Sequence, residues 1–165
     1  MEYLQIFDEN KIPLNEKVNR KEKNNLVGNK YFMVVLIFIE NSEGKFLLQK
    51  TSKLKGSCMA TTGGHVKYGE SSIDTIIREF EEENGFRLNK DNIEYVDDVF
   101  DGCCIVDIYY AKYDIDISTV KVQEEEVESI GWYSIDEIKK FIEKDEFRKG
   151  NIDAFNKVLK YREKI

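Results

Sequence analysis

The chain of 165 residues has the length of one ordinary domain with its own core, so we expect a single domain over residues 1–165. A hydrophobic fraction of 41% and a single proline exclude a collagen-like or wholly disordered chain. The formal net charge of −7 argues against broad, sequence-independent binding of nucleic acid, because such binding depends on neutralised phosphates. An acidic protein that handles phosphates needs metal ions or a local cluster of lysines.

The first 30 residues indicate an N-terminal extension that leads into the core. A short strand is expected over 3–7 (YLQIF), and a polar stretch rich in Lys and Asn follows over 10–30. The opening residues show no basic start followed by an apolar core, so we expect no secretory signal and a cytoplasmic protein. The longest apolar run, 31–39 (YFMVVLIFI), is shorter than the ~20 residues that cross a bilayer as a helix, which indicates a buried strand.

The rest of the chain mixes strands with helices. Segments 31–39 and 45–50 (KFLLQK), separated by ENSEG, are predicted to form a hairpin. After a helix over about 72–84, strands are expected over 93–100, 103–115 and 128–135, and helices from about 135 and over 151–165. Because strand-helix units do not repeat regularly, we expect an α/β fold with a mixed sheet packed between helices, and not a doubly wound sheet.

Local signals predict the bounds of the helix over about 72–84. Ser71 or Ser72 can cap its N-terminus, Asp74 stands three residues after Ser71, and Gly85 can end the last turn. One stripe of this helix is apolar and can pack against the sheet: Ile73, Ile76, Ile77 and Phe80.

The other face of this helix gathers like charges. Glu79, Glu82 and Glu83 stand at i, i+3 and i+4, so their side chains meet on one patch and repel by a few tenths of a kcal/mol per pair. A hard divalent cation such as Mg²⁺ or Mn²⁺ prefers carboxylate oxygens and would remove this repulsion. Arg78 can orient a carboxylate through its planar fork. A solvated acidic helix face is the alternative.

The residues around these glutamates favour the cation. Nine positions follow the pattern Gly, five residues, Glu, seven residues, then Arg-Glu-apolar-x-Glu-Glu-x-Gly-apolar: Gly64, Glu70, Arg78, Glu79, Phe80, Glu82, Glu83, Gly85 and Phe86. Segment 64–86 therefore resembles the Nudix box of the Nudix hydrolases, with an aromatic Phe80 where aliphatic residues are more common. The resemblance implies an α/β/α sandwich and an enzyme in which metal ions assist water in cleaving a diphosphate linkage.

The resemblance also assigns roles to residues of the box. It implies metal ligands at four positions: Gly64 through its carbonyl oxygen, and the side chains of Glu79, Glu82 and Glu83. Arg78 would orient these carboxylates, and Glu70 would either bind the metal through water or pair with Arg78. Glu82 is the first candidate for the general base. The expected ion is Mg²⁺, with Mn²⁺ as an alternative.

Two segments outside the box carry further candidates. In 122–132 (VQEEEVESIGW), Glu126 stands where relatives often carry a loop glutamate, so it is either a second catalytic candidate or part of a solvated turn. Lys50, Lys53 and Lys55 follow a core strand and either hold substrate phosphates or lie on an exposed loop. The single histidine, His65, is expected to make local hydrogen bonds, because metal-assisted attack by water does not require imidazole.

A neighbouring branch of the family supplies the main alternative function. The segments YLQIFDEN, GKFLLQK and TTGGHVKYGE, together with Arg20 after an asparagine, resemble the branch that contains isopentenyl diphosphate isomerases and related hydrolases. Those isomerases use a cysteine immediately before the box Gly-His and a glutamate on a later strand. This chain has Gly63 at the first position and offers Asp107 on the later strand, so we prefer a hydrolase on an isomerase-like frame. A non-catalytic nucleotide-binding module is a third alternative, although such modules usually lack a box carboxylate.

The sequence thus predicts a metal-dependent hydrolase that cleaves a diphosphate linkage in a nucleoside diphosphate derivative or a related organic pyrophosphate, by attack of water at phosphorus. Four aromatic residues either stack on a nucleobase or belong to the core: Phe100, Tyr109, Tyr110 and Trp132. The expected partner is a small-molecule diphosphate and not a membrane or a nucleic acid, and relatives suggest a homodimer.

Overall fold

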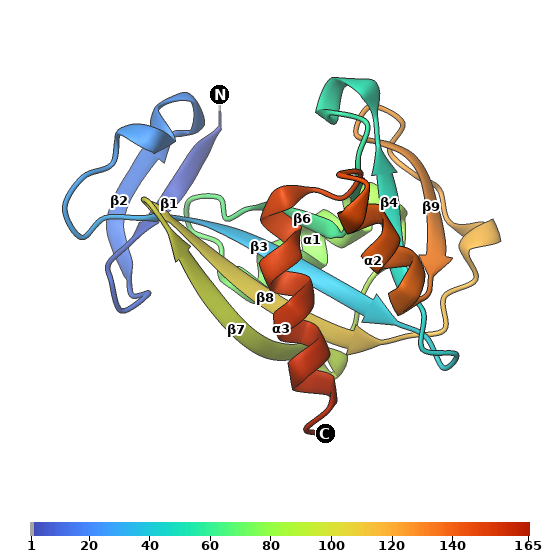
Figure 1. The fold of residues 1–165 in the computed structure, drawn as a ribbon. Coiled ribbons are helices and arrows are strands. Elements are labelled where there is room, and N and C mark those ends of the chain that lie inside the picture. Colours follow the sequence, from blue (N-terminus) through green and yellow to red (C-terminus); the bar gives the residue numbers. More distant parts are fainter. Residues whose placement is uncertain (1) are drawn as a thin grey trace.

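The computed structural model describes residues 2–165, which form a mixed sheet covered by helices on both faces (Figure 1). Within these residues the large sheet has seven strands: β3 (Phe32–Glu40), β4 (Phe46–Thr51), β5 (Met59–Ala60), β6 (Thr62–His65), β7 (Glu94–Asp101), β8 (Cys104–Lys112) and β9 (Val127–Tyr133). The helix α1 (Ser72–Asn84) packs on one face, and α2 (Ile135–Glu143) and α3 (Ile152–Arg162) pack on the other. The predicted mixed sheet between helices is confirmed.

Strand β3 is the centre of the core because it is buried on both faces. Its alternate side chains enter two hydrophobic clusters, with Val35 and Ile37 on the α1 side and Leu36 and Phe38 on the α3 side. It runs parallel to β8 over its whole length, from Phe32 opposite Cys104 to Glu40 opposite Lys112. A continuous apolar run is typical of a strand buried on both faces.

Helix α1 has the bounds that its sequence predicts. The Ser71 side chain accepts a hydrogen bond from the Asp74 amide at 3.2 Å, which satisfies one of the free amides of the first turn. Gly85 ends the helix in the left-handed conformation, with φ of 70°. Ile76, Ile77 and Phe80 are buried against the sheet.

The hairpin predicted over 31–50 is confirmed only at its turn. In the part of the chain that the structure describes, β3 and β4 pair at Glu40 and Phe46 and then separate. Strand β6 takes the free edge of β3, from Thr62 opposite Ile37 to His65 opposite Val34, while β5 and β9 flank β4. The two strands therefore form a V, which is visible in Figure 1.

The N-terminal extension contains a strand that the sequence analysis did not predict. Strands β1 (Tyr3–Phe7) and β2 (Pro13–Asn19) form a separate two-stranded sheet, and the short 3₁₀ helix η1 (Arg20–Asn25) follows. We call residues 3–19 the N-terminal hairpin. The buried side chains of Leu4, Ile6 and Phe7 hold it against the core. No helix in residues 2–165 is long and apolar enough to cross a membrane.

Candidate active site

A cleft of about 740 Å³ lies where β3 and β4 separate. Its floor comes from the ends of β3, β6 and β8 and consists of Val34, Leu36, Gly63, His65, Cys104 and Val106. One bank consists of Glu2, Tyr3 and Arg20 from residues 2–29, which we call the N-terminal segment, and of Lys67 from the loop between β6 and α1. The other bank comes from loops, with Lys55, Gln123, Glu126 and Arg148. The side chains of Glu79, Glu82 and Glu83 on α1 also face this cleft.

Two consecutive glycines lie between Leu36 on the cleft floor and the Glu79 carboxylate on α1. A Cβ atom on Gly63 would lie 2.5 Å from Cδ2 of Leu36, whereas one on Gly64 would lie 2.2 Å from Cδ of Glu79. Consecutive Cα atoms are about 3.8 Å apart, so an apolar surface and a carboxylate approach the same two-residue stretch of backbone. Side chains at these positions would displace one or the other.

Glu83 is a buried carboxylate with an incomplete set of hydrogen bonds. The residue is 4% exposed, and its Oε1 accepts a hydrogen bond from Nε2 of Gln49 at 3.3 Å. Its Oε2 is buried and has no hydrogen-bond partner within residues 2–165. Burial, together with the neighbouring charge of Glu79, raises the pKa of Glu83 to about 8. A buried carboxylate in this state is unfavourable unless a cation or a proton joins it.

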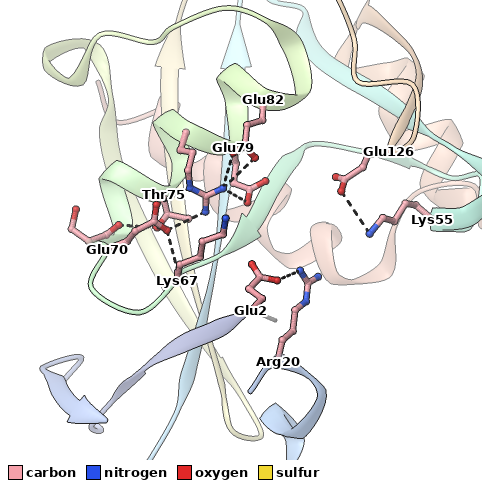
Figure 2. Close-up of polar contacts among 11 residues, drawn as sticks. Glu2, Arg20, Lys55, Lys67, Glu70, Thr75, Glu79, Glu82 and Glu126 are labelled. Carbon is pink, nitrogen blue, oxygen red and sulfur yellow. Dashed lines mark hydrogen bonds and ion pairs between the residues drawn. The ribbon is translucent and has the colours of Figure 1, made fainter. Parts of the chain in front are cut away.

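Arg78 connects the other three carboxylates of the box, Glu70, Glu79 and Glu82, which Figure 2 labels. Its Nε and Nη2 donate to the two oxygens of Glu70 at 2.7 and 3.0 Å, a bidentate contact. Its Nη1 lies 3.0 Å from Oε1 of Glu79 and 3.2 Å from Oε2 of Glu82. The hydrogen bond to Glu70 and the charges of Glu79 and Glu82 raise the pKa of Arg78, although burial opposes this. Glu70 is therefore the partner of Arg78 in this structure.

The carboxylates fit a hard cation in their chemistry, although the side chains are not yet arranged around one. No three His, Cys, Asp or Glu side chains in residues 2–165 form a ready set of metal ligands, and Nη1 of Arg78 lies between Glu79 and Glu82. The donors nevertheless include a buried carboxylate oxygen without a partner, on Glu83. Burial also raises the pKa of Glu79, whose side chain is 15% exposed. Oxygen donors of this kind suit Mg²⁺ or Mn²⁺.

The two candidates on the loop bank lie together. Nζ of Lys55 is 3.9 Å from Oε1 of Glu126, and both residues line the cleft. The loops that carry them are joined by Ser52, whose amide donates to the Glu126 carbonyl at 3.0 Å and whose hydroxyl donates to the Glu125 carbonyl at 2.7 Å.

Lys50 and Lys53 do not reach the cleft. On β4, Gln49 and Thr51 line the cleft, so the side chain of Lys50 points to the opposite face of the strand. There its Nζ lies 3.6 Å from Glu128. Lys53 is exposed in the short 3₁₀ helix η2 (Lys53–Lys55) and is not among the residues that line the cleft. The structure therefore retains one of the three lysines as a substrate-binding candidate.

His65 lines the cleft in a neutral state. Burial, followed by the positive charges of Arg20 and Lys23, lowers the pKa of His65 to about 4. Its Nε2 lies 2.8 Å from Nζ of Lys23 and accepts that hydrogen bond, and its ring stacks on Phe32. These contacts agree with the expected local hydrogen-bonding role.

The cleft also contains residues that the sequence analysis did not single out. Gln49 holds Glu83, and Arg148 donates to the carbonyl of Lys55 at 3.0 Å. Glu2 reaches the cleft from the N-terminal segment, beside Arg20, which the sequence analysis named only for the branch resemblance. The aromatic candidates lie elsewhere, because Phe100, Tyr109, Tyr110 and Trp132 are absent from its lining within the described chain. No local sequence signal marks Glu2, Gln49 or Arg148, since their positions in the cleft depend on contacts between distant segments.

The fold and the cleft together define a class of protein. A mixed sheet lies between helices, and a loop and helix rich in glutamate line a cleft at one end of the sheet, as in an α/β/α sandwich of the Nudix type. A family model described as the NUDIX domain matches residues 30–155, which is more than half of the chain. The protein therefore belongs to the Nudix family and is a Nudix hydrolase. Enzymes of this family generally use divalent metal ions and act on small molecules.

Solved structures show the same fold at low sequence identity. DR0079 from Deinococcus radiodurans has a TM-score of 0.71 and 18% identity, covering 92% of this chain and 94% of that one. A MutT protein from Methanosarcina mazei has a TM-score of 0.61 and 23% identity, with coverage of 76% and 91%. A NUDIX hydrolase from Nitrosomonas europaea has a TM-score of 0.61 and 21% identity, with coverage of 78% and 88%. At these identities the likeness concerns the fold alone.

Proposed function

We propose that this Nudix hydrolase uses Mg²⁺ or Mn²⁺ to cleave a diphosphate linkage in a nucleoside diphosphate derivative or a related organic pyrophosphate. Water attacks at phosphorus. The observation that carries the proposal is the state of Glu83, a buried carboxylate beside Glu79 with one oxygen unpartnered within the described chain, at the edge of a cleft with basic banks. A cation bound there offsets the cost of burying the carboxylates and attracts phosphate oxygens.

Four groups would hold the metal: the side chains of Glu79, Glu82 and Glu83, and the carbonyl oxygen of Gly64, whose backbone adjoins Glu79. When bound, the ion neutralises charge on the phosphates and makes the attacking water more acidic. Arg78 orients Glu79 and Glu82 through Nη1 while its other two nitrogens remain bound to Glu70. Because Glu70 anchors Arg78 independently, the guanidinium can keep its place when the glutamates turn toward a cation.

Glu82 is our first candidate for the residue that accepts the proton of the attacking water. Its side chain is 48% exposed and lines the cleft, so water can reach it. Glu126 is the second candidate, because it lines the opposite bank beside Lys55. Lys55 would neutralise phosphate charge on that bank.

The structure gives the isomerase alternative no support. Asp107, the acid on the later strand, is 3% exposed and binds Lys11 at 2.8 Å and the Ser72 hydroxyl at 2.7 Å on the α1 side of the sheet. Cys104 and Val106, on the opposite side of β8, face the cleft instead. Asp107 is thus held away from any substrate on the cleft floor. No observation favours the non-catalytic module.

The test is product analysis by mass spectrometry of the purified protein with Mg²⁺. The panel contains nucleoside phosphates, nucleotide sugars, dinucleoside polyphosphates and isopentenyl diphosphate. We expect metal-dependent cleavage of at least one diphosphate and a loss of at least about a hundredfold in kcat for Glu83→Gln. Glu81→Gln is the matched control, because Glu81 is exposed on the same helix, pairs with Arg87 and lies outside the cleft.

Three outcomes would overturn this proposal. They are no cleavage of any panel member, equal cleavage by wild type and Glu83→Gln, or conversion of isopentenyl diphosphate to dimethylallyl diphosphate without hydrolysis. The last would establish the isomerase.

A further inference from the structure

The N-terminal segment forms one bank of the cleft, although it lies outside the residues matched by the family model. That match begins at residue 30, whereas Glu2, Tyr3 and Arg20 all line the cleft. This segment therefore supplies side chains that the box and the sheet do not provide.

Backbone hydrogen bonds fix this bank to the loop that precedes α1. The amide of Gln5 donates to the Val66 carbonyl at 3.2 Å, and the amide of Tyr68 donates to the Tyr3 carbonyl at 3.0 Å. The amide of Gly69 also donates to the side-chain oxygen of Gln5 at 3.0 Å. The bank consequently keeps a defined position relative to the start of the carboxylate-bearing helix.

Arg20 is held at the edge of the cleft by two contacts with Glu2. Its amide donates to the Glu2 carbonyl at 3.1 Å, and its Nη1 donates to Oε2 of Glu2 at 2.8 Å. Figure 2 shows this pair extending from the N-terminal segment. The Nε and Nη2 atoms of Arg20 make no hydrogen bond to residues 2–165, and 42% of the side chain is exposed. An oriented guanidinium with two such donors suits bidentate binding of a phosphate.

The surroundings of Arg20 are basic, in contrast to the net charge of the chain. Lys67 lines the same bank, and Lys23 lies beside His65 at the edge of the floor. Although burial acts in the opposite direction, the hydrogen bond and charge of Arg20, with the charge of Lys67, lower the pKa of Glu2. Glu2 is thus anionic at neutral pH, where its carboxylate binds the guanidinium as a substrate phosphate would.

We propose that Arg20 binds a phosphate of the substrate from the N-terminal bank, and that Glu2 positions its guanidinium when no phosphate is present. The proposal rests on the proposed function, since it assumes a diphosphate between the α1 carboxylates and this bank. It extends that function by assigning a specificity-determining residue to the N-terminal segment. The negative charge of Glu2 then weakens phosphate binding, whereas the positive charge of Arg20 strengthens it.

The first experiment measures binding of inorganic pyrophosphate with Mg²⁺ by calorimetry. We expect Arg20→Gln to weaken binding about tenfold or more, because a bidentate charged contact is lost. We expect Glu2→Gln to tighten it about two- to fivefold, because glutamine keeps an acceptor for Arg20 but removes the negative charge. Lys30→Gln is the matched control, since Lys30 forms an ion pair at 2.6 Å with Glu16 of the N-terminal segment. Its side chain is 47% exposed and lies outside the cleft. The control should change the Kd less than twofold.

Kinetics with a cleaved substrate separate this inference from the proposed function. Arg20→Gln should raise KM about tenfold with kcat changed less than about threefold, at an unfolding temperature near that of wild type. If hydrolysis occurs and Arg20→Gln leaves both KM and Kd unchanged, this inference is wrong and the proposed function stands. If nothing is hydrolysed but pyrophosphate binding depends on Arg20 and Glu2 in opposite senses, the inference stands without the hydrolase. If Glu2→Gln and Arg20→Gln both weakened pyrophosphate binding, the ion pair would have only a structural role and this inference would be overturned.

Discussion

Gly63 and Gly64 show how two neighbouring residues can serve different surfaces. The space beside Gly63 is occupied by Leu36 and by the backbone oxygen of Val35, which would lie 2.7 Å from a Cβ. The space beside Gly64 is occupied by the carboxyl end of Glu79. A backbone oxygen in a sheet cannot easily move, whereas the end of a glutamate side chain can turn away. The same substitution should therefore have different effects at the two positions.

We predict that Gly63→Ala lowers the free energy of unfolding by about 1–3 kcal/mol, as overpacking does elsewhere. Gly64→Ala should leave stability closer to wild type but displace Glu79 from the cation site. Thermal unfolding with and without Mg²⁺ tests both, because an ion at a hundred times its Kd stabilises by about 2.7 kcal/mol. Gly63→Ala should keep the Mg²⁺-dependent shift and Gly64→Ala should lose most of it. An intact shift in Gly64→Ala would contradict the assignment of Glu79.

Contacts between side chains on one helix could be predicted from the sequence, whereas positions that depend on the course of a loop could not. Glu79, Glu82, Glu83 and Arg78 share one helix, where spacing alone decides which side chains meet. The pairing of Arg78 with Glu70 was one of two predicted alternatives. Lys55 lines the cleft while Lys50 and Lys53 do not, and this difference depends on the path of β4 and of the loop after it. The spacing of the lysines in the sequence does not specify that path.

At the scale of elements, prediction succeeded where the signals are local. Helix α1 begins and ends at the predicted residues because its caps are neighbours in sequence. The sequence analysis did not predict strand β2, because its residues are polar and largely exposed. The strand is recognised mainly by its pairing with β1. The opening of β3 and β4 was missed because β6 and β8 take the edges of β3 through long-range contacts.

The N-terminal hairpin is held to the sheet by a partly buried ion pair near its turn. Nζ of Lys11 lies 2.8 Å from Asp107 and 3.1 Å from Asp98, and it donates to the Tyr95 hydroxyl at 2.8 Å. The Asp107 side chain is 4% exposed, so removing the cation leaves a buried carboxylate with the Ser72 and Tyr109 hydroxyls near it. This geometry makes Lys11 a structural residue of the hairpin.

We predict that Lys11→Met lowers the free energy of unfolding by about 2–3 kcal/mol, as expected for loss of a charged hydrogen bond from a buried partner. The unfolding temperature should fall by about 5–10 °C in a chain of this size. Adding Asp107→Asn should recover part of the loss, because the buried group is then neutral. Lys21→Met, an exposed site, is the control. Urea unfolding that shows equal stability for Lys11→Met and the control would refute the role of this pair.

At the scale of the whole molecule, both ends of the chain are tied to the central parallel pair of strands. The hairpin binds Asp107 of β8 through Lys11, and α3 binds Glu40 of β3 through Arg162, whose Nη2 lies 2.8 Å from Oε2. Both acids are buried. Although burial acts against it, the hydrogen bonds from Arg162 and Tyr110 lower the pKa of Glu40 from its ordinary value of 4.5.

This arrangement predicts a specific acid sensitivity. Because the pKa of Glu40 is lower in the folded state, its stabilising contribution is present above pH 4.5 and is lost as the pH falls through the folded pKa. Glu40→Gln should therefore be less stable than wild type at pH 7, by about 2 kcal/mol, and this difference should shrink as the pH falls below 4.5. Glu43→Gln, at an exposed site in the following turn, is the control. A difference that stays constant from pH 7 to pH 3 would rule out the linkage.

The opening between β3 and β4 also bears on how such an enzyme can change over evolution. The two banks of the cleft come from the N-terminal segment and from loops after β4, before β9 and before α3, whereas the carboxylates come from α1. Insertions or substitutions in either bank can alter what the cleft admits without moving the helix that carries the acidic residues. The architecture thus allows substrate preference to diverge in each bank separately while the chemical step is inherited unchanged.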